Sequence, residues 1–201
     1  MSIVRCMIYF CLAAGSWSVM ADADPENSYY TTGLPSRDGI GKFYMGREIS
    51  HIMGHLGAGW LERPERERQE RTDLLIAGLS LSEDSVVADI GAGTGYFTFP
   101  VAQRVSRGKV FSVDIQPEML ARIERRKALE NVANVETVLG EEDDPKLPDN
   151  EIDLAFIVDA YHEFSFPREM GERLKESLKP GGQLVLVEYR AEDPRVPIKR
   201  L

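Results

Sequence analysis

Short apolar runs recur along the second half of the chain, separated by stretches in which apolar residues have helical spacing. The runs have the composition and length of strands that are buried on both faces, as in a parallel sheet. They predict strands at residues 86–90, 109–114, 135–139, 152–158 and 183–189. The intervening periodicity predicts helices at residues 94–105, 117–129 and 167–179. This alternation indicates an α/β fold in which a mostly parallel sheet carries helices on both faces.

Residues 1–23 have the features of a segment that is removed from the mature protein. Arg5 provides a positive start, residues 6–14 form an apolar run too short to span a bilayer, and small residues follow up to Ala21-Asp22-Ala23. The segment resembles a secretory signal peptide that is cleaved near Ala21 to Ala23; a buried N-terminal helix of a cytoplasmic enzyme is the alternative. Both cysteines lie in this segment, so the mature chain would contain no thiol.

The region before the first predicted strand has a weaker pattern. A short helix could form over residues 43–56, and it would place Arg47, His51 and His55 on one face. A second helix is expected to begin near Pro64 and to carry Arg66 on its solvated face. The predicted organisation is therefore a signal peptide (1–23), a linker (24–42) and one domain (43–201) with N-terminal cap helices (43–80) and a ligand-binding core (81–190).

Glycines follow the first predicted strand at alternate positions. Asp89 ends the apolar run, Gly91, Gly93 and Gly95 come next, and Thr94 is the predicted N-cap of the helix that follows. A dinucleotide-binding turn would need a glycine where this chain has Tyr96, and a P-loop would need a lysine that is absent. The stretch therefore predicts a ligand site of a different kind at the carboxyl end of the strand.

The string Asp89-x-Gly91-x-Gly93-x-Gly95 resembles motif I of the class I S-adenosylmethionine-dependent methyltransferases. The resemblance runs from about residue 79 to residue 189 and implies the Rossmann-like class I methyltransferase fold. It also implies S-adenosyl-L-methionine as the cofactor and methyl transfer as the activity. The positions that match the cofactor-binding residues of that family are Asp89, Gly91, Ala92, Gly93, Gly95, Asp114, Ile115, Glu141, Glu142 and Asp159.

Asp114 stands at the end of the second predicted strand, where a carboxylate can accept hydrogen bonds from both ribose hydroxyls. The resemblance implies an acidic partner for the adenine amino group after the third strand, and the sequence leaves the choice between Glu141 and Glu142 open. It places residues that face cofactor and acceptor after the fourth strand, where Asp159, Tyr161 and His162 follow.

His162 is the expected catalytic base because its ordinary pKa is near neutrality, with Tyr161 as a catalytic neighbour; mere packing beneath the cofactor is the alternative for His162. Helices before motif I commonly shape the substrate pocket in the resembled family. The expected substrate-binding residues are therefore Tyr44, Arg47, His51 and Trp60.

The chain departs from the resembled family at its C-terminal end. Family members continue with a helix and an antiparallel hairpin that forms strands six and seven, which are missing before Leu201. The sequence is thus a fragment, or its sheet has a short edge.

The formal net charge of −9 argues against nucleic acid as a partner. A small-molecule acceptor is expected, in an exported protein, periplasmic or secreted, without a stable membrane anchor after cleavage. Other readings remain open: a non-catalytic protein that holds S-adenosylmethionine or S-adenosylhomocysteine, an aminopropyl transferase, and a metal site built from His51, His55 and His162. No metal is expected in the preferred interpretation.

Overall fold

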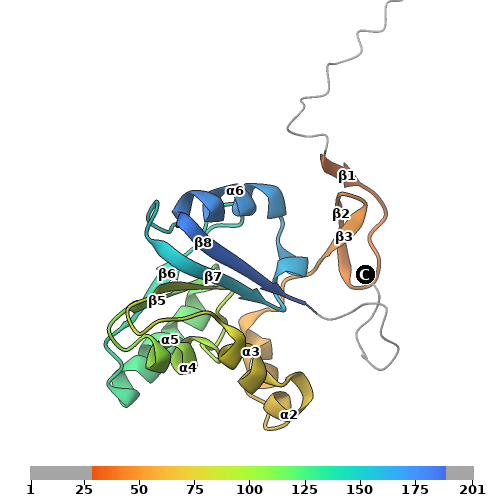
Figure 1. Cartoon of the computed structure of the whole chain (residues 1–201). Coiled ribbons are helices and arrows are strands. Elements are labelled where there is room, and N and C mark those ends of the chain that lie inside the picture. The colour runs from red at the N-terminus through yellow and green to blue at the C-terminus, as the bar shows by residue number, and fades with distance from the viewer. Residues whose placement is uncertain (1–28, 189–201) are drawn as a thin grey trace, which may run out of the picture.

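The computed structural model describes residues 29–188, which contain a five-stranded parallel sheet and a smaller antiparallel sheet (Figure 1). The strand order of the parallel sheet is β6-β5-β4-β7-β8. Its members are β4 (Val86–Ile90), β5 (Lys109–Asp114), β6 (Val135–Leu139), β7 (Ile152–Val158) and β8 (Leu178–Val187). The predicted α/β class and the Rossmann-like class I methyltransferase fold are confirmed.

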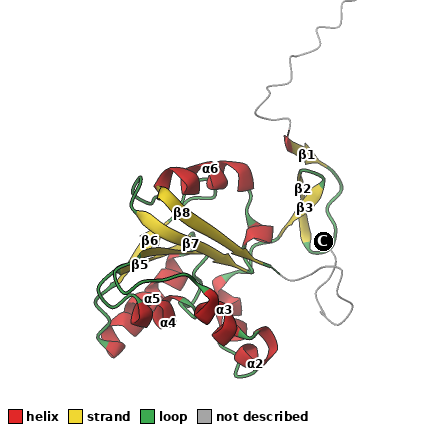
Figure 2. Ribbon diagram, in the orientation of Figure 1, coloured by secondary structure: helices red, strands yellow, loops and turns green. Residues whose placement is uncertain are grey.

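Helices cover both faces of this sheet (Figure 2). On one face, α4 (Thr98–Arg104) and α5 (Pro117–Glu130) pack in a core that includes Val87 and Phe156. On the other face, α6 (Pro167–Ser177) packs through Met170 and Leu174 against residues of the alternate set, such as Ala88. Alternate residues of the same strands therefore belong to two separate apolar cores. Both faces of each strand are buried, which explains why the strands are continuous apolar runs in the sequence.

The strand order reverses direction beside β4, because β5 pairs with one of its edges and β7 with the other. Ile90 is in register with Val113 of β5 and with Ile157 of β7, so the carboxyl ends of the three strands lie together. Open α/β sheets bind ligands at such a switch point. The topology therefore gathers the residues that follow β4, β5 and β7.

The N-terminal region contains a β-hairpin where the pattern predicted a helix. The small sheet consists of β1 (Tyr30–Thr32), β2 (Gly39–Tyr44) and β3 (Arg47–Ser50), so the helix expected over 43–56 is wrong, and part of the expected linker is in strands. Met45 and Gly46 join β2 to β3 with φ values of 50° and 84°. Two consecutive residues with positive φ form the tight turn that suits a hairpin and that a helix cannot contain.

Four short helical elements lead from this hairpin to the parallel sheet: η2 (His55–Gly57), α1 (Ala58–Leu61), α2 (Arg66–Glu70) and α3 (Thr72–Gly78). The helix predicted to begin near Pro64 is therefore two helices. They are separated at Arg71, which has a φ of 51°. Arg66 is buried and bonds to Glu70, so its expected place on a solvated face is also wrong.

Two predicted helix ends differ from the structure. The helix after β4 begins at Thr98 and not at Thr94, whose hydroxyl donates to Glu62 instead of capping the helix. Helix α6 ends at Ser177, and the residues 180–182 that were predicted to stop it lie within β8. Lys179 is held there by an ion pair with Asp153 at 2.8 Å, which extends the strand toward the helix.

Within residues 29–188, β8 is an edge strand that pairs with β7 alone. Its Leu184 and Leu186 are 46% and 48% exposed. The predicted signal peptide and the last residues of the chain lie outside the described part. Among the described residues, no helix has both the length and the apolar character that a membrane crossing requires.

Candidate active site

A cavity of about 370 Å³ opens at the carboxyl ends of β4, β5, β6 and β7. Its floor is formed by residues that directly follow these strands, and its cover by residues 52–66. The predicted cofactor-binding and catalytic residues that line it are Asp89, Gly91, Ala92, Gly93, Asp114, Ile115, Glu141, Glu142, Asp159 and His162. The switch point of the sheet thus brings together most of the residues that the sequence singled out.

The glycines after β4 have different structural roles. Gly93 has a φ of 56°, and a Cβ there would lie 2.9 Å from Leu61 Cδ1 in the cover of the cavity. Gly95 has a φ of 80°, and a Cβ there would lie 2.8 Å from the ring of Phe99. Gly95 does not line the cavity. It allows the turn to pack closely against α4 instead.

Asp114 is 7% exposed and binds the glycine turn directly. Its Oδ2 accepts from the backbone N of Gly93 and its Oδ1 from the backbone N of Gln116, both at 2.8 Å. Burial raises the pKa of this carboxyl, although these backbone hydrogen bonds act in the opposite direction. Each carboxylate oxygen can accept more than one hydrogen bond, so the pair retains capacity for a ligand.

Asp89 lines the cavity, but its carboxylate is directed to the core. It is 3% exposed, and its Oδ2 accepts from Thr98 Oγ1 at 2.6 Å, while Thr98 in turn accepts from Ser112 at 3.0 Å. Burial raises the pKa of Asp89 to about 7 despite the Thr98 hydrogen bond, and the charge of Asp114 adds to the effect. This carboxylate therefore ties β4 to α4 and β5.

Glu141 and Glu142 both line the cavity beyond β6. Lys146 Nζ lies 3.0 Å from Glu141 Oε2, so one of the two carboxylates is already in an ion pair. The choice that the sequence left open between them remains open in the structure.

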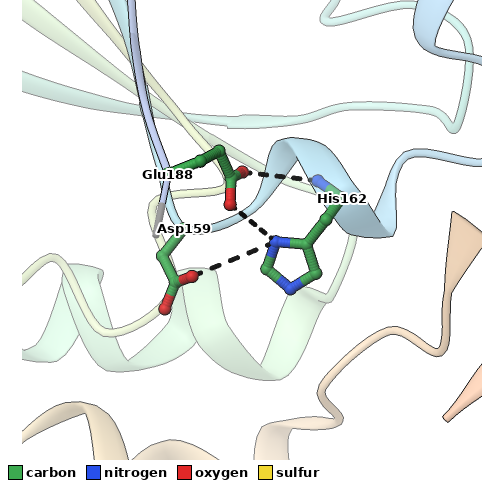
Figure 3. Close-up of side chains that lie close together, drawn as sticks. All are labelled: Asp159, His162 and Glu188. Atoms are coloured by element: carbon green, nitrogen blue, oxygen red, sulfur yellow. Dashed lines mark hydrogen bonds and ion pairs between the residues drawn. The ribbon is translucent and has the colours of Figure 1, made fainter. Parts of the chain in front are cut away.

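His162 lies beside the carboxylates of Asp159 and Glu188 (Figure 3). Its Nδ1 is 2.9 Å from Oε2 of Glu188, which follows β8, and 4.0 Å from Oδ1 of Asp159, which follows β7. The other ring nitrogen points away from both and lies 3.8 Å from Oε1 of Glu163. Because a carboxylate only accepts, the Glu188 contact assigns the proton to Nδ1 and leaves Nε2 as the acceptor of a neutral ring.

The charges in this cluster shift its titrations. Burial lowers the pKa of His162, but the Glu188 hydrogen bond and the negative charges of Glu188, Asp159 and Glu163 outweigh it and raise the pKa. Burial raises the pKa of Asp159 to about 6 and that of Glu163 to about 7. Asp159 also has a φ of 52°, so its backbone is held in a conformation that L residues rarely adopt.

The same three residues could also hold a metal ion. The donor atoms of Asp159, His162 and Glu188 all lie within 4.8 Å of one another. His51 and His55 do not take part in this group, so the metal site that the sequence suggested from three histidines is not assembled in the described residues. His55 instead faces Glu118 at 3.8 Å.

The cover of the cavity contains residues that sequence reasoning missed. Ile52 and Met53 line it, and Gln116 fixes this segment, since its amide donates to Met53 O at 3.0 Å and accepts from His55 N at 2.7 Å. Leu61 and Arg66 line it from α1 and α2. A glutamine directly after the β5 acid offered no distinctive pattern in the sequence.

The expected substrate-binding and catalytic residues are only partly assembled. Trp60 lines the cavity, and its ring stacks on the guanidinium of Arg63 at 3.7 Å. Tyr44, Arg47, His51 and Tyr161 do not line it. The helix that would have placed Arg47 and His51 on one face with His55 is not formed, because residues 39–50 form a hairpin. Tyr44 of this hairpin packs against Tyr30, with ring centroids 5.3 Å apart. Tyr161 packs on Phe164 at 5.7 Å.

Comparison with known proteins finds a family that the centre of the chain resembles. Residues 87–182 match the family described as Methyltransferase domain. This stretch includes the glycine turn, Asp114 and His162, but not the hairpin, the cover residues or Glu188. The parallel sheet and its cavity are thus similar to a methyltransferase domain.

Individual relatives show the same resemblance. The chain is 30% identical over 126 residues to an uncharacterized methyltransferase-like protein of Schizosaccharomyces pombe, covering 63% of this chain and 46% of that protein. It is 32% identical over 108 residues to a ubiquinone/menaquinone biosynthesis C-methyltransferase of Hydrogenovibrio crunogenus, covering 52% and 42%. The chain thus spans about half the length of the curated relatives that it matches.

A solved structure covers more of the chain. The crystal structure of an S-adenosylmethionine-dependent methyltransferase from Aquifex aeolicus superposes with a TM-score of 0.66 at 27% sequence identity. The match covers 74% of this chain and 80% of that one.

Proposed function

We propose that this chain, whose centre resembles a methyltransferase domain, is an enzyme that transfers a methyl group from S-adenosyl-L-methionine to a small-molecule acceptor. The observation that carries the proposal is the cavity itself, which joins the glycine turn and Asp114 on one side to the His162–Glu188 pair on the other. A non-catalytic binding protein would need the glycine turn and Asp114 to hold the cofactor, but binding alone would not require an imidazole that is oriented by a carboxylate.

The residues of the cavity fit this cofactor. Gly93 lines the cavity without a side chain, and a Cβ there would collide with Leu61, so backbone can approach the amino-acid moiety. Asp114 is positioned to accept from ribose hydroxyls, and Glu141 or Glu142 from the adenine amino group. The acidic lining also suits a ligand with positive sulfonium and ammonium groups.

The mechanism assigns the proton to His162. When bound, the cofactor supplies an electrophilic methyl group on a positively charged sulfur. Nε2 of His162 would accept the proton of the acceptor nucleophile while the methyl carbon exchanges its bond to sulfur for a bond to that nucleophile, which leaves a neutral thioether. Glu188 would stabilise the imidazolium that results. The cover residues orient the acceptor and exclude water, which protects the geometry of in-line transfer.

The acceptor is proposed to be a small molecule. The part of it that lies against His162 is proposed to be uncharged or cationic. The cavity is closed by Ile52, Met53 and Trp60, which offer apolar contacts. Carboxylates of Asp159 and Glu163 surround the proposed base, and they would repel an anionic group. Tyr44, Arg47 and His51 remain proposals for contacts with a larger acceptor at the rim.

Export to the periplasm or the medium is proposed from the resemblance of residues 1–23 to a signal peptide. Nucleic acid is not proposed as a partner because of the net negative charge. The intact mass of protein recovered from the extracytoplasmic fraction tests the export. A mature chain in the cytoplasm that still begins at Met1 would contradict it.

Two measurements test the activity. Mass spectrometry of what co-purifies with the protein, and calorimetry with S-adenosylmethionine and NAD, identify the cofactor. Assays with methyl-labelled S-adenosylmethionine across phenol, amine and carbon acceptors then identify the reaction. Tight binding without label transfer to any acceptor class would favour the non-catalytic binding protein, and tighter NAD binding would contradict the proposal.

A further inference from the structure

Arg66 is a buried cation in a cavity whose other charged walls are acidic. It is 4% exposed and lines the cavity from α2. Apart from His162 and the neutral phenol of Tyr96, the other ionisable side chains among the described residues of the lining are carboxyl groups: Asp89, Asp114, Glu141, Glu142, Asp159 and Glu163. We propose that Arg66 binds the carboxylate of the amino-acid moiety of S-adenosylmethionine. This inference rests on the proposed function, since it assumes that cofactor.

The guanidinium of Arg66 is fixed before any ligand binds. Its Nε donates to Glu70 Oε2 and its Nη1 donates to the carbonyl of Leu61, both at 2.9 Å. A guanidinium has five N–H donors, which is more than these two bonds use. Glu70 offsets the cost of burying the charge, and the planar group retains donors for a ligand.

Aromatic rings of the glycine turn hold the same group from the other side. The Cζ atom of Arg66 lies 4.4 Å from the ring centre of Tyr96 and 5.1 Å from that of Phe97. Leu61, whose carbonyl holds Arg66, also contacts the position of Gly93. The positive charge is therefore located at the glycine-turn end of the cavity.

The chemistry of the cofactor selects the occupant of this position. Its one anionic group is the carboxylate, which the ionised carboxyl groups of the lining would repel elsewhere in the cavity. Arginine binds a carboxylate with two parallel hydrogen bonds. Asp114 would hold the ribose from β5, so Arg66 and Asp114 together would fix the direction in which the cofactor lies.

Calorimetry with S-adenosylhomocysteine and with its decarboxylated analogue tests the contact. In the wild type we expect S-adenosylhomocysteine to bind roughly 10- to 100-fold more tightly than the analogue. Arg66→Gln should weaken S-adenosylhomocysteine alone and bring the two affinities close together. Arg63→Gln is the matched control, because Arg63 also pairs with Glu70 but does not line the cavity, and it should keep the wild-type preference.

Several outcomes would overturn the inference. Equal binding of both ligands by the wild type would remove the contact and leave the proposed function intact. Equal weakening of both ligands in Arg66→Gln would make Arg66 a structural residue, and unchanged binding with a higher KM for an anionic acceptor would assign it to the acceptor. Arg66→Lys, which keeps the charge, should retain part of the preference and serves if Arg66→Gln does not fold. A wild type that binds neither ligand would overturn the proposed function too.

Discussion

Nδ1 of His162 lies 2.9 Å from Oε2 of Glu188, which links the turn after β7 to the residue that follows β8. The sheet itself creates this pair, since Val158 and Val187 are in register and the backbone N of Asp159 donates to the carbonyl of Val187 at 2.9 Å. The proposed base is thus oriented by a neighbouring strand and not by its own helical turn.

The first prediction concerns the pH dependence of methyl transfer. His162 must be neutral to accept a proton, so the rate should rise with pH, with a midpoint above the ordinary imidazole pKa of 6.5. Glu188→Gln removes the charge that raises the pKa of His162, while burial continues to lower it. The rise of the rate with pH should therefore have a lower midpoint in this variant, and the maximal rate at high pH should also be lower. A pH–rate profile that is identical to the wild type would show that Glu188 does not act on the base.

The second prediction separates chemistry from binding at His162. His162→Asn keeps a polar group of similar size but removes the base, so turnover should fall by about 10²–10⁴-fold. The affinity for S-adenosylmethionine should change little, because the proposed cofactor contacts come from Arg66 and from residues at the ends of β4, β5 and β6. His55→Asn is the control, since His55 is half exposed and lies outside the lining. Preserved turnover in His162→Asn would make His162 a packing residue.

The third prediction concerns the cofactor end of the cavity. Both oxygens of Asp114 accept hydrogen bonds from backbone N–H groups, those of Gly93 and Gln116. Asp114→Asn replaces one of these oxygens with an amide donor and removes the charge, so S-adenosylmethionine binding should weaken by about 1.5–3 kcal/mol. Gly93→Val should abolish binding, because the side chain enters the cavity beside Leu61.

Matched controls exist for both variants. Asp149→Asn changes an exposed turn carboxylate. Gly46→Val imposes a side chain at a φ of 84° with nothing within 4 Å, which tests backbone strain alone. Wild-type affinity in both cavity variants by calorimetry would disprove the site.

The sequence was most informative for strands of the parallel sheet, because both faces of these strands are buried. The strands at 109–114 and 152–158 were predicted at their observed bounds, because continuous apolar runs have few other uses. The hairpin of β2 and β3 was missed because its sheet is small and half-exposed, so its pattern resembles that of a weak helix.

The parts of the site that were missed depend on long-range pairing. Glu188 is 26 residues from His162 in the sequence, and only the register of β7 with β8 makes them neighbours. Arg66 was expected on a solvated face because the pattern of charges along 62–71 is typical of an exposed helix. Its burial results from the break at Arg71 and from the glycine turn that packs over it.

The fourth prediction uses metal removal to separate two uses of the Asp159–His162–Glu188 group. These donor atoms lie close enough to hold an ion, but Nδ1 of His162 is already hydrogen-bonded to Glu188. We therefore expect a chelator to leave methyl transfer unchanged. Added Zn²⁺ should inhibit it, because an ion bound at Nδ1 leaves the ring proton on Nε2, which then cannot act as the base. Loss of activity on chelation, restored by one divalent cation and absent in Glu188→Gln, would identify a metal enzyme instead.

The last prediction concerns stability and rests on Asp89. Its pKa is raised from 3.8 to about 7 chiefly by burial, so the folded chain binds this proton more tightly than the unfolded chain. The free energy of unfolding should therefore fall as the pH rises between these two values. Each pKa unit is worth about 1.36 kcal/mol, so the change should amount to a few kcal/mol at most.

Asp89→Asn removes this dependence, because the amide has no charge to bury, while its oxygen can still accept from Thr98. The stability of the wild type minus that of the variant should decline steadily from acid to neutral pH. Urea unfolding at several pH values measures this difference, and contributions from Asp159 and Glu163 largely cancel in it because both chains carry them. A difference that is independent of pH would show that folding leaves the pKa of Asp89 at its ordinary value. A difference that grows with pH would mean that the charged carboxylate is stabilised by its surroundings, and Asp89 would then be expected to bind a cationic part of the ligand directly.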